Sequence, residues 1–213
     1  MAKLKKLIIA CDGESASGKS TAAKLVSKKY KLLLINSGLL YRYCSKLIIK
    51  DKPKNIIPYL KKKFKTVSYK AIAKQKLHSE EISNHVAVLA KNKKVREIVN
   101  QLQMKIIRAN NRICVEGRDI ASKILAKNPK YDLAFYFKCS LEVAAHRRWL
   151  DLKKSVPLNE VKRSLKIRTS LDKKRKNSPL IKVKDAILVR SDKLNKKEVL
   201  AKMSKAVEKV LKN

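Results

Sequence analysis

The residues best suited to chemistry form a segment that begins at Gly13 and reads G-E-S-A-S-G-K-S-T. The spacing G-x-x-x-x-G-K-S, after an apolar run and before a helical pattern, is typical of a P-loop, which holds phosphate with its backbone N–H groups. In such a loop Lys19 reaches the β- and γ-phosphates of a nucleoside triphosphate, and the Ser20 hydroxyl binds Mg²⁺. The predicted triphosphate site comprises Gly13, Glu14, Ser15, Ala16, Ser17, Gly18, Lys19, Ser20 and Thr21.

Glycine is scarce in this chain, with 4 glycines in 213 residues. We expect glycine to be kept only where another side chain cannot go, because of a positive φ or close approach to a ligand. Within the loop, Ala16 stands where glycine is common, and Glu14 brings a carboxylate close to phosphate. We therefore expect Glu14 to point to solvent or to pair with a cation. The glycines are Gly13, Gly18, Gly38 and Gly117.

Two further polar segments follow apolar runs of the kind that form buried strands. One reads S-G-L-L-Y-R and ends at Arg42, and the other reads G-R-D and contains Arg118. Ligands bind at the carboxyl ends of strands in a parallel α/β sheet, and the planar fork of Arg grips phosphate through two bonds. Read alone, Arg118 and Asp119 are also consistent with a local salt bridge. The candidate residues for an anionic substrate are Ser37, Arg42, Arg118 and Asp119.

A long helical pattern contributes two more candidates. Arg96 and Gln103 lie seven residues apart, which places both on one face of a helix. Taken alone, Arg96 is more typical of an exposed surface. In a chain whose usual cation is Lys, an Arg is informative because Lys cannot copy its bidentate grip.

Apolar runs alternate with helical spacing along the chain and predict an α/β fold with a five-stranded parallel sheet flanked by helices. Two charged segments, at about 50–85 and about 151–179, interrupt this alternation. The predicted strands are residues 7–12, 32–35, 112–116, 133–137 and 186–189. The predicted helices are residues 19–29, 39–49, 86–108, a helix capped by Ser140, 158–172 and 195–211.

The composition sets limits on partners and location. The net charge of +37 invites a nucleic-acid interpretation, but the Lys residues are spread along the whole chain rather than clustered, so we expect mainly a solvated surface. No apolar run reaches the length of a membrane span. The four Cys residues are scattered without metal-binding spacing, which favours reduced, buried thiols in a cytoplasmic enzyme. We expect a monomer with no membrane and no nucleic-acid partner.

The chain resembles the bacterial cytidylate (CMP) kinases, which are nucleoside monophosphate kinases, from about residue 7 to its end. The family shows G-P-S-G-x-G-K-[GS]-T, D-S-G-x-x-Y-R, V-R-x with a later Gln, D-G-R-D-x-G-T, A-H-R-R and R-D-x-x-D-x-x-R. The matching segments are 13–21, 36–42, Val95-Arg96 with Gln103, 116–119, 145–148, and Arg168 with Asp172 and Arg175.

The resemblance implies a P-loop NTPase fold in one domain, 1–213, with a monophosphate-binding (NMP-binding) insert at about 50–85 and a lid at about 151–179. It also implies transfer of the ATP γ-phosphoryl group to CMP, and to dCMP, with Mg²⁺ held by Ser20. The implied catalytic residues are Lys19, Arg118 and Arg147, and Arg147 also approaches the ATP phosphates. The implied acceptor-binding residues are Ser37, Arg42, Arg96, Gln103, Arg118, Asp119, Asp172 and Arg175.

Several residues depart from the family pattern and keep alternatives open. Asn36 and Glu116 stand where the family has Asp, Ala121-Ser122 replaces Gly-Thr, and Ala87 aligns with a Ser that helps to read cytosine. Loss of a base contact weakens discrimination between acceptors. One alternative is therefore a P-loop kinase for another nucleotide or for a small acceptor such as shikimate. The other is a nucleic-acid-binding P-loop ATPase, although few aromatic residues are present for base stacking.

Overall fold

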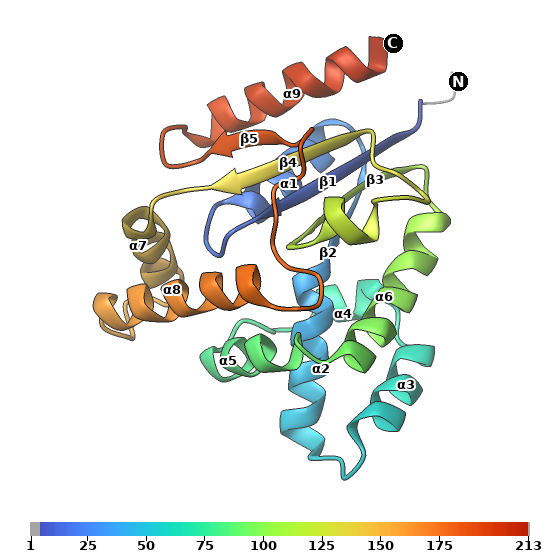
Figure 1. The fold of residues 1–213 in the computed structure, drawn as a ribbon, viewed down its shortest axis with the longest axis vertical. Coiled ribbons are helices and arrows are strands. Elements are labelled where there is room, and N and C mark those ends of the chain that lie inside the picture. The colour runs from blue at the N-terminus through green and yellow to red at the C-terminus, as the bar shows by residue number, and fades with distance from the viewer. Residues whose placement is uncertain (1–4, 213) are drawn as a thin grey trace. The chain divides into compact units, whose positions relative to one another are not determined.

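A computed structural model describes residues 5–212 of the protein (Figure 1). The chain folds into two compact units. The first contains the chain up to Ile35 and from Asn110 onward, and the second runs from Asn36 to Ala109. The predicted insert at about 50–85 falls inside the second unit, whereas the predicted lid belongs to the first.

The first unit is built on a parallel sheet, which confirms the predicted fold class. Its five strands have the order β2-β3-β1-β4-β5, so that β1, which leads into the P-loop, is central. β1 pairs with β3 from Leu7↔Arg112 to Asp12↔Gly117, and with β4 as far as Gly13↔Phe137. The strands are β1 (Leu7–Gly13), β2 (Leu33–Asn36), β3 (Arg112–Gly117), β4 (Leu133–Lys138) and β5 (Ile187–Arg190).

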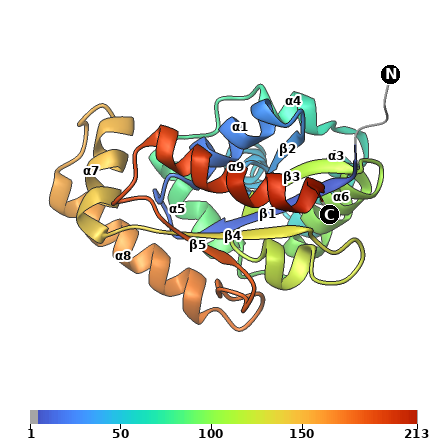
Figure 2. The ribbon, with the colours of Figure 1, turned by 90° about the horizontal axis from the view of Figure 1, so that it is seen from above.

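α1 and α9 cover one face of the sheet with apolar side chains, whereas α7 and α8 pack against each other. Figure 2 shows α1 and α9 on one face of the sheet and the short π-helical segment η1 on the other. Ser140 caps α7 by accepting a hydrogen bond from Val143 N at 3.3 Å, as predicted. The helical elements of this unit are α1 (Lys19–Lys29), η1 (Ile120–Ile124), α7 (Leu141–Asp151), α8 (Leu158–Lys174) and α9 (Lys196–Lys212).

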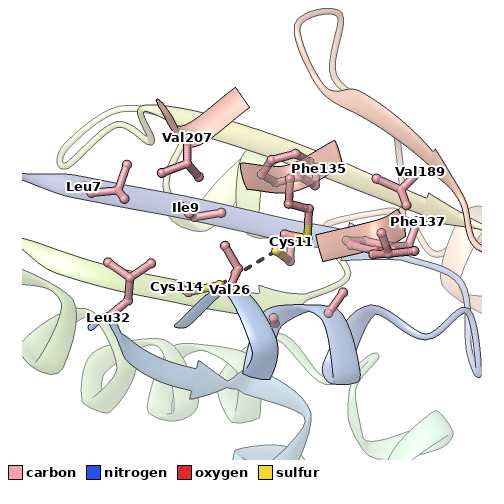
Figure 3. Packing of buried hydrophobic residues seen from close by; sticks show 14 residues of the cluster. Leu7, Ile9, Cys11, Val26, Leu32, Cys114, Phe135, Phe137, Val189 and Val207 are labelled. Atoms are coloured by element: carbon pink, nitrogen blue, oxygen red, sulfur yellow. Dashed lines mark hydrogen bonds between the residues drawn. The ribbon is translucent and has the colours of Figure 1, made fainter. Parts of the chain in front are cut away.

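The core of this unit lies between the sheet and the α1–α9 layer (Figure 3). Ile9, Cys11 and Phe135 are almost fully buried there. Burial of an Ile or Phe side chain contributes about 1.5–3 kcal/mol. Cys11 and Cys114 lie with their sulfur atoms 3.8 Å apart as free thiols. The chain has four free, buried cysteines, as the sequence predicts.

The second unit is entirely helical within the structure described, and it corrects one prediction. The single helix predicted over 86–108 is two helices, because Ala90 ends the first and Asn92 caps the second by accepting a hydrogen bond from Val95 N at 3.2 Å. Its helices are α2 (Ser37–Asp51), α3 (Ile56–Thr66), α4 (Tyr69–Ala73), α5 (Glu80–Leu89) and α6 (Lys93–Arg108).

A separate core holds these helices together, with Leu40, Leu60 and Val99 fully buried.

Across residues 5–212, no helix combines the length and the apolar character required to cross a membrane.

Candidate active site

The P-loop leaves the end of β1 with backbone geometry that requires glycine at two positions. Gly13 has φ +154°, and a Cβ there would overlap the Phe137 carbonyl oxygen of the neighbouring strand. Gly18 has φ +74° immediately before α1 begins. Gly38 lies in the first turn of α2 without a positive φ, so for this glycine close approach to a ligand stays the predicted reason.

Ala16 adopts the left-handed backbone conformation, with φ +54°. A Cβ in this conformation costs about 1–2 kcal/mol relative to the right-handed region. The residue that the sequence marked as unusual is therefore a strained position, and the loop retains the glycine-like geometry without glycine.

The first turn of α1 places a cation and a hydroxyl beside the loop. Lys19 is 7% exposed, and burial lowers its pKa from 10.5 to about 7, assisted by the nearby charges of Arg118 and Arg168. Ser20 donates a hydrogen bond from Oγ to Glu116 Oε2 at 2.7 Å. Glu116, at the end of β3, thus brings a buried carboxylate to the residue predicted to bind metal.

Glu14 pairs with a cation, which was one of its two predicted environments. Its Oε1 atom lies 2.7 Å from Lys173 Nζ on α8, and the Glu14 side chain is 12% exposed. This ion pair turns the carboxylate toward α8 and neutralises it.

Arg118 and Asp172 form the centre of an ion-pair network in the first unit. Arg118 donates from Nε to Asp172 Oδ2 and from Nη2 to Ser15 Oγ, both at 2.9 Å. Arg175 lies 3.6 Å from Asp172 and 3.5 Å from Asp119. Burial alone would raise the pKa of Asp172, but Arg118, Arg168 and Arg175 hold it below its ordinary value. A local Arg118–Asp119 salt bridge was one interpretation of the sequence, but Arg118 pairs with Asp172 and Asp119 with Arg175.

Asp12 fixes the backbone that follows Arg118 and Asp119. It is 2% exposed, and its two carboxylate oxygens accept hydrogen bonds from Ile120 N and Ala121 N, each at 2.8 Å. Burial raises the pKa of Asp12 to about 6, while the two N–H groups oppose that shift. The turn after Gly117 is thereby fixed to the strand that leads into the P-loop.

Arg147 of α7 lies beside the P-loop, close to Gly18. Its Nη1 donates to Ser191 Oγ at 3.0 Å, and its Nη2 donates to the Ser191 carbonyl at 2.7 Å. A cavity of about 570 Å³ opens here, with Gly18, Lys19, Arg147 and Asn195 in its wall.

The second unit contains its own group of predicted residues. Ser37 donates from Oγ to Gln103 Oε1 at 2.5 Å, and both side chains are buried. Gln103 Nε2 is buried with no hydrogen-bond partner among the residues described. Its two N–H groups are therefore donors that a ligand can satisfy.

Both predicted arginines of the second unit are buried as well. Arg42 donates from Nη1 to Leu77 O at 3.0 Å and to Ser83 Oγ at 2.8 Å. Arg96 is 5% exposed and lies with its guanidinium carbon 5.5 Å from the centre of the Tyr41 ring. The interpretation of Arg96 as an exposed surface residue is wrong. Its side chain contacts Tyr41 and the Ala90 carbonyl.

The predicted site residues thus fall into two groups, one in each unit. The first holds the P-loop with Arg118, Arg147 and the Asp172 network, and the second holds Ser37, Arg42, Arg96 and Gln103. Among the described residues, no cluster of His, Cys, Asp and Glu has the make-up of a protein-only metal site. Sequence reasoning did not assign Asp12, Glu116 or Ser191 to the site. The signal for Glu116 was its place in a family motif where Asp is usual, and the signal for Asp12 was a carboxylate at a strand end.

Comparison with known proteins supplies the family. The model of the cytidylate kinase family matches residues 9–209. The cytidylate kinase of Listeria innocua is 30% identical to the chain over 226 residues, covering 98% of this chain and 99% of that protein.

The chain belongs to the cytidylate kinase family.

A second relative is a longer protein, and this chain matches only part of it. The bifunctional pantoate ligase/cytidylate kinase of Prochlorococcus marinus AS9601 is 35% identical over 92% of this chain, which spans only 42% of that relative. Among solved structures, the shikimate kinase of Bacteroides thetaiotaomicron shares the fold, with a TM-score of 0.52 at 9% identity and coverage of 95% and 98% of the two chains.

The structure explains two residues at which this cytidylate kinase family member departs from the family motifs. Asn36, in place of Asp, caps α2 by accepting a hydrogen bond from Leu39 N at 3.2 Å, so the cap is retained without the charge. Glu116, one methylene longer than Asp, contacts the Ser20 hydroxyl directly. Nothing in the structure explains Ala87.

Proposed function

We propose that the protein transfers the γ-phosphoryl group of ATP to CMP and to dCMP, giving ADP and CDP or dCDP. The observation that carries the proposal is Arg118, whose guanidinium contacts Ser15 of the P-loop and Asp172 of α8 at the same time. Such a cation lies next to the donor loop and within the predicted acceptor-binding network. Phosphoryl transfer needs mainly the positioning and neutralisation of charged phosphates, with little covalent work by the protein.

The donor ATP is proposed to bind to the first unit. The P-loop N–H groups and the start of α1 favour phosphate, and Lys19 is placed to approach the β- and γ-phosphates. The cavity of about 570 Å³ has room for the adenosine part, and Arg147 in its wall faces the loop. No general base is needed, because the accepting phosphate oxygen is already anionic near neutral pH.

Mg²⁺ fits the residues beside the loop. Ser20 Oγ and the buried Glu116 carboxylate are oxygen ligands of the type that Mg²⁺ prefers, and they lie 2.7 Å apart. Ser20 would hold the ion and Glu116 would orient Ser20 or a bound water. When bound with ATP, the ion supplies neutralisation of the phosphate charge.

Two sets of residues are proposed to bind the acceptor nucleotide. Arg42, Arg96 and the Gln103 Nε2 group, which has no partner among the described residues, are suited to its anionic and polar atoms. Arg118 and Arg175 are suited to its phosphate, and Asp119 and Asp172 to its sugar and the neighbouring arginines. The complete proposed acceptor set is Ser37, Arg42, Arg96, Gln103, Arg118, Asp119, Asp172 and Arg175.

We also infer that residues at about 50–85 act as an NMP-binding insert and those at about 151–179 as a lid. Closure of the lid would exclude water from the γ-phosphate and suppress ATP hydrolysis. The protein is proposed to act as a monomer in the cytoplasm.

A coupled ADP-release assay with five acceptors tests the proposed reaction. We expect CMP and dCMP to stimulate ADP release at least 10-fold over shikimate, and by a smaller factor over UMP and AMP, because Ala87 cannot supply the base contact of the family Ser. If only shikimate or AMP stimulated ADP release, that compound would be the acceptor instead of CMP. The absence of stimulation by every pyrimidine monophosphate would refute the proposal.

Binding of ATP is expected to be accompanied by proton uptake near pH 8. Lys19 has a pKa of about 7 in the free protein and is mostly neutral at this pH, and adjacent phosphates should raise that pKa and protonate it. Calorimetry in two buffers of different ionisation enthalpy would give an uptake of up to about one proton. Lys19→Gln should abolish the uptake and Lys24→Gln, on the exposed side of α1, should retain it. Equal uptake in both variants would contradict the prediction.

A further inference from the structure

Ser191 is a buried residue to which no role in the reaction has been assigned above. It follows the last residue of β5 and is 4% exposed. Its backbone N–H donates to Lys138 O at 3.1 Å, which continues the β4–β5 pairing by one residue. The position of Ser191 is therefore fixed by the sheet rather than by a mobile loop.

The hydroxyl of Ser191 is bonded to the backbone of the P-loop. Ser191 Oγ donates to the Ser17 carbonyl oxygen at 2.7 Å, in a buried contact. Ser17 itself donates from Oγ to the Glu14 carbonyl at 2.8 Å and immediately precedes Gly18. Ser191 thus holds the loop one residue before the left-handed turn that starts α1.

The same residue receives both terminal nitrogens of Arg147. Nη1 donates to Ser191 Oγ at 3.0 Å and Nη2 donates to the Ser191 carbonyl at 2.7 Å. Two bonds from one planar group fix its orientation as well as its distance. A Cβ added to Gly18 would lie 3.6 Å from Arg147 Nη1 and 3.7 Å from Ser191 Oγ, so the pair packs directly against the loop.

We propose that Ser191 is a positioning residue for phosphoryl transfer: it holds the Arg147 guanidinium and the P-loop backbone in a fixed relation. The inference rests on the proposed function, because it assigns Arg147 to the phosphates of ATP. The Ser191 hydroxyl is suited to this task because it accepts from Arg147 while donating to Ser17. An alanine would leave the Arg147 fork with one acceptor and the Ser17 carbonyl without its donor.

A comparison of three variants tests the proposal. Ser191→Ala is expected to lower kcat/KM for ATP about 10-fold, as the loss of one hydrogen bond to a charged group implies. KM for CMP should change less than 2-fold, because the lost contacts lie on the donor side. Ser191→Thr keeps the hydroxyl and should restore most of the activity. Ser204→Ala, which removes another buried serine of the same unit, should leave kinetics unchanged.

A double-mutant cycle with Arg147→Met separates positioning from general stability. In the Arg147→Met background, Ser191→Ala should lower kcat/KM for ATP by less than 3-fold, because there is no guanidinium left to orient. A full 10-fold loss in that background, or the same loss in Ser204→Ala, would overturn the proposal.

Binding of a fluorescent ATP analogue separates this proposal from the proposed function. We expect Ser191→Ala to weaken analogue binding about 3- to 10-fold with no acceptor present, measured at a temperature at which the variant is fully folded. Analogue binding equal to that of the wild-type protein would overturn the positioning role. Failure of CMP as an acceptor would instead refute the proposed reaction and leave this measurement unaffected.

Discussion

Replacing Lys19 with Met is expected to lower kcat by about 10³-fold, the size of effect that follows removal of a single preorganised electrostatic group. Met has nearly the same length and is flexible, so it can fill the space of the Lys19 stem without a charge. The loss should be largest in kcat, because charge on the transferred phosphoryl group and the leaving oxygen is greatest in the transition state.

The same substitution is expected to stabilise the protein without nucleotide. Burial lowers the pKa of Lys19 to about 7, below its ordinary value of 10.5, so the unfolded chain binds more protons than the folded protein between these two pH values. The free energy of unfolding should therefore rise with pH across that window. Met abolishes this pH dependence and should add at least about 1 kcal/mol at pH 7.

Urea unfolding at pH 7 and pH 9, together with steady-state kinetics, measures both effects. Lys24→Met is the matched control, since Lys24 is exposed on the same helix. It should change neither kcat nor the pH dependence of unfolding. If Lys19→Met kept its activity, or if unfolding lost none of its pH dependence, Lys19 would not be the buried phosphate-binding cation inferred above.

The strands and most helices were predictable because their signals are local. The apolar run at the start of β1 and the helical spacing of α1 depend on neighbouring residues only, and the predicted α1 bounds agree with the structure. The division between α5 and α6 was missed because apolar residues occur at helical spacing on both sides of the polar run 91–94. Asn92, a good N-cap, was the available signal for that break.

The π-helical segment η1 could not be predicted from the sequence, for a different reason. Its first two N–H groups bond to Asp12, more than 100 residues away in sequence. A π-helical turn of this kind depends on a tertiary partner, and its own residues carry no periodic signal.

In the candidate site too, local features were predictable from the sequence and contacts between distant residues were not. The P-loop segment could be recognised from the sequence because its residues are consecutive and its phosphate-binding geometry is backbone geometry. The pairing of Arg118 with Asp172 joins residues 54 apart, so only the resemblance to a family suggested that both belong to one site. Ser191 could not be found in this way, because an isolated serine after a strand is common and its role depends on Arg147 and Ser17 lying beside it.

Replacing Arg118 with Lys is expected to lower kcat/KM for CMP about 100-fold. Arg118 uses separate nitrogens for Asp172 and Ser15, each at 2.9 Å, and the point charge of Lys cannot maintain both contacts and grip phosphate bidentately. Loss of one or two charge-assisted bonds of about 1.5–3 kcal/mol each accounts for an effect of this size.

The effect on ATP should be much smaller, and this difference identifies the role of Arg118. The P-loop keeps its backbone N–H groups and Lys19 in the variant, so we expect Kd for ATP to rise less than 5-fold. Arg190→Lys is the control, because Arg190 pairs with Asp192 at an exposed position of the same unit. If Arg118→Lys weakened ATP and CMP equally, Arg118 would serve the P-loop through Ser15 rather than the acceptor. Since Asp172 bonds to the same guanidinium, Asp172→Asn should then also weaken ATP binding, whereas an acceptor role predicts that it raises KM for CMP alone.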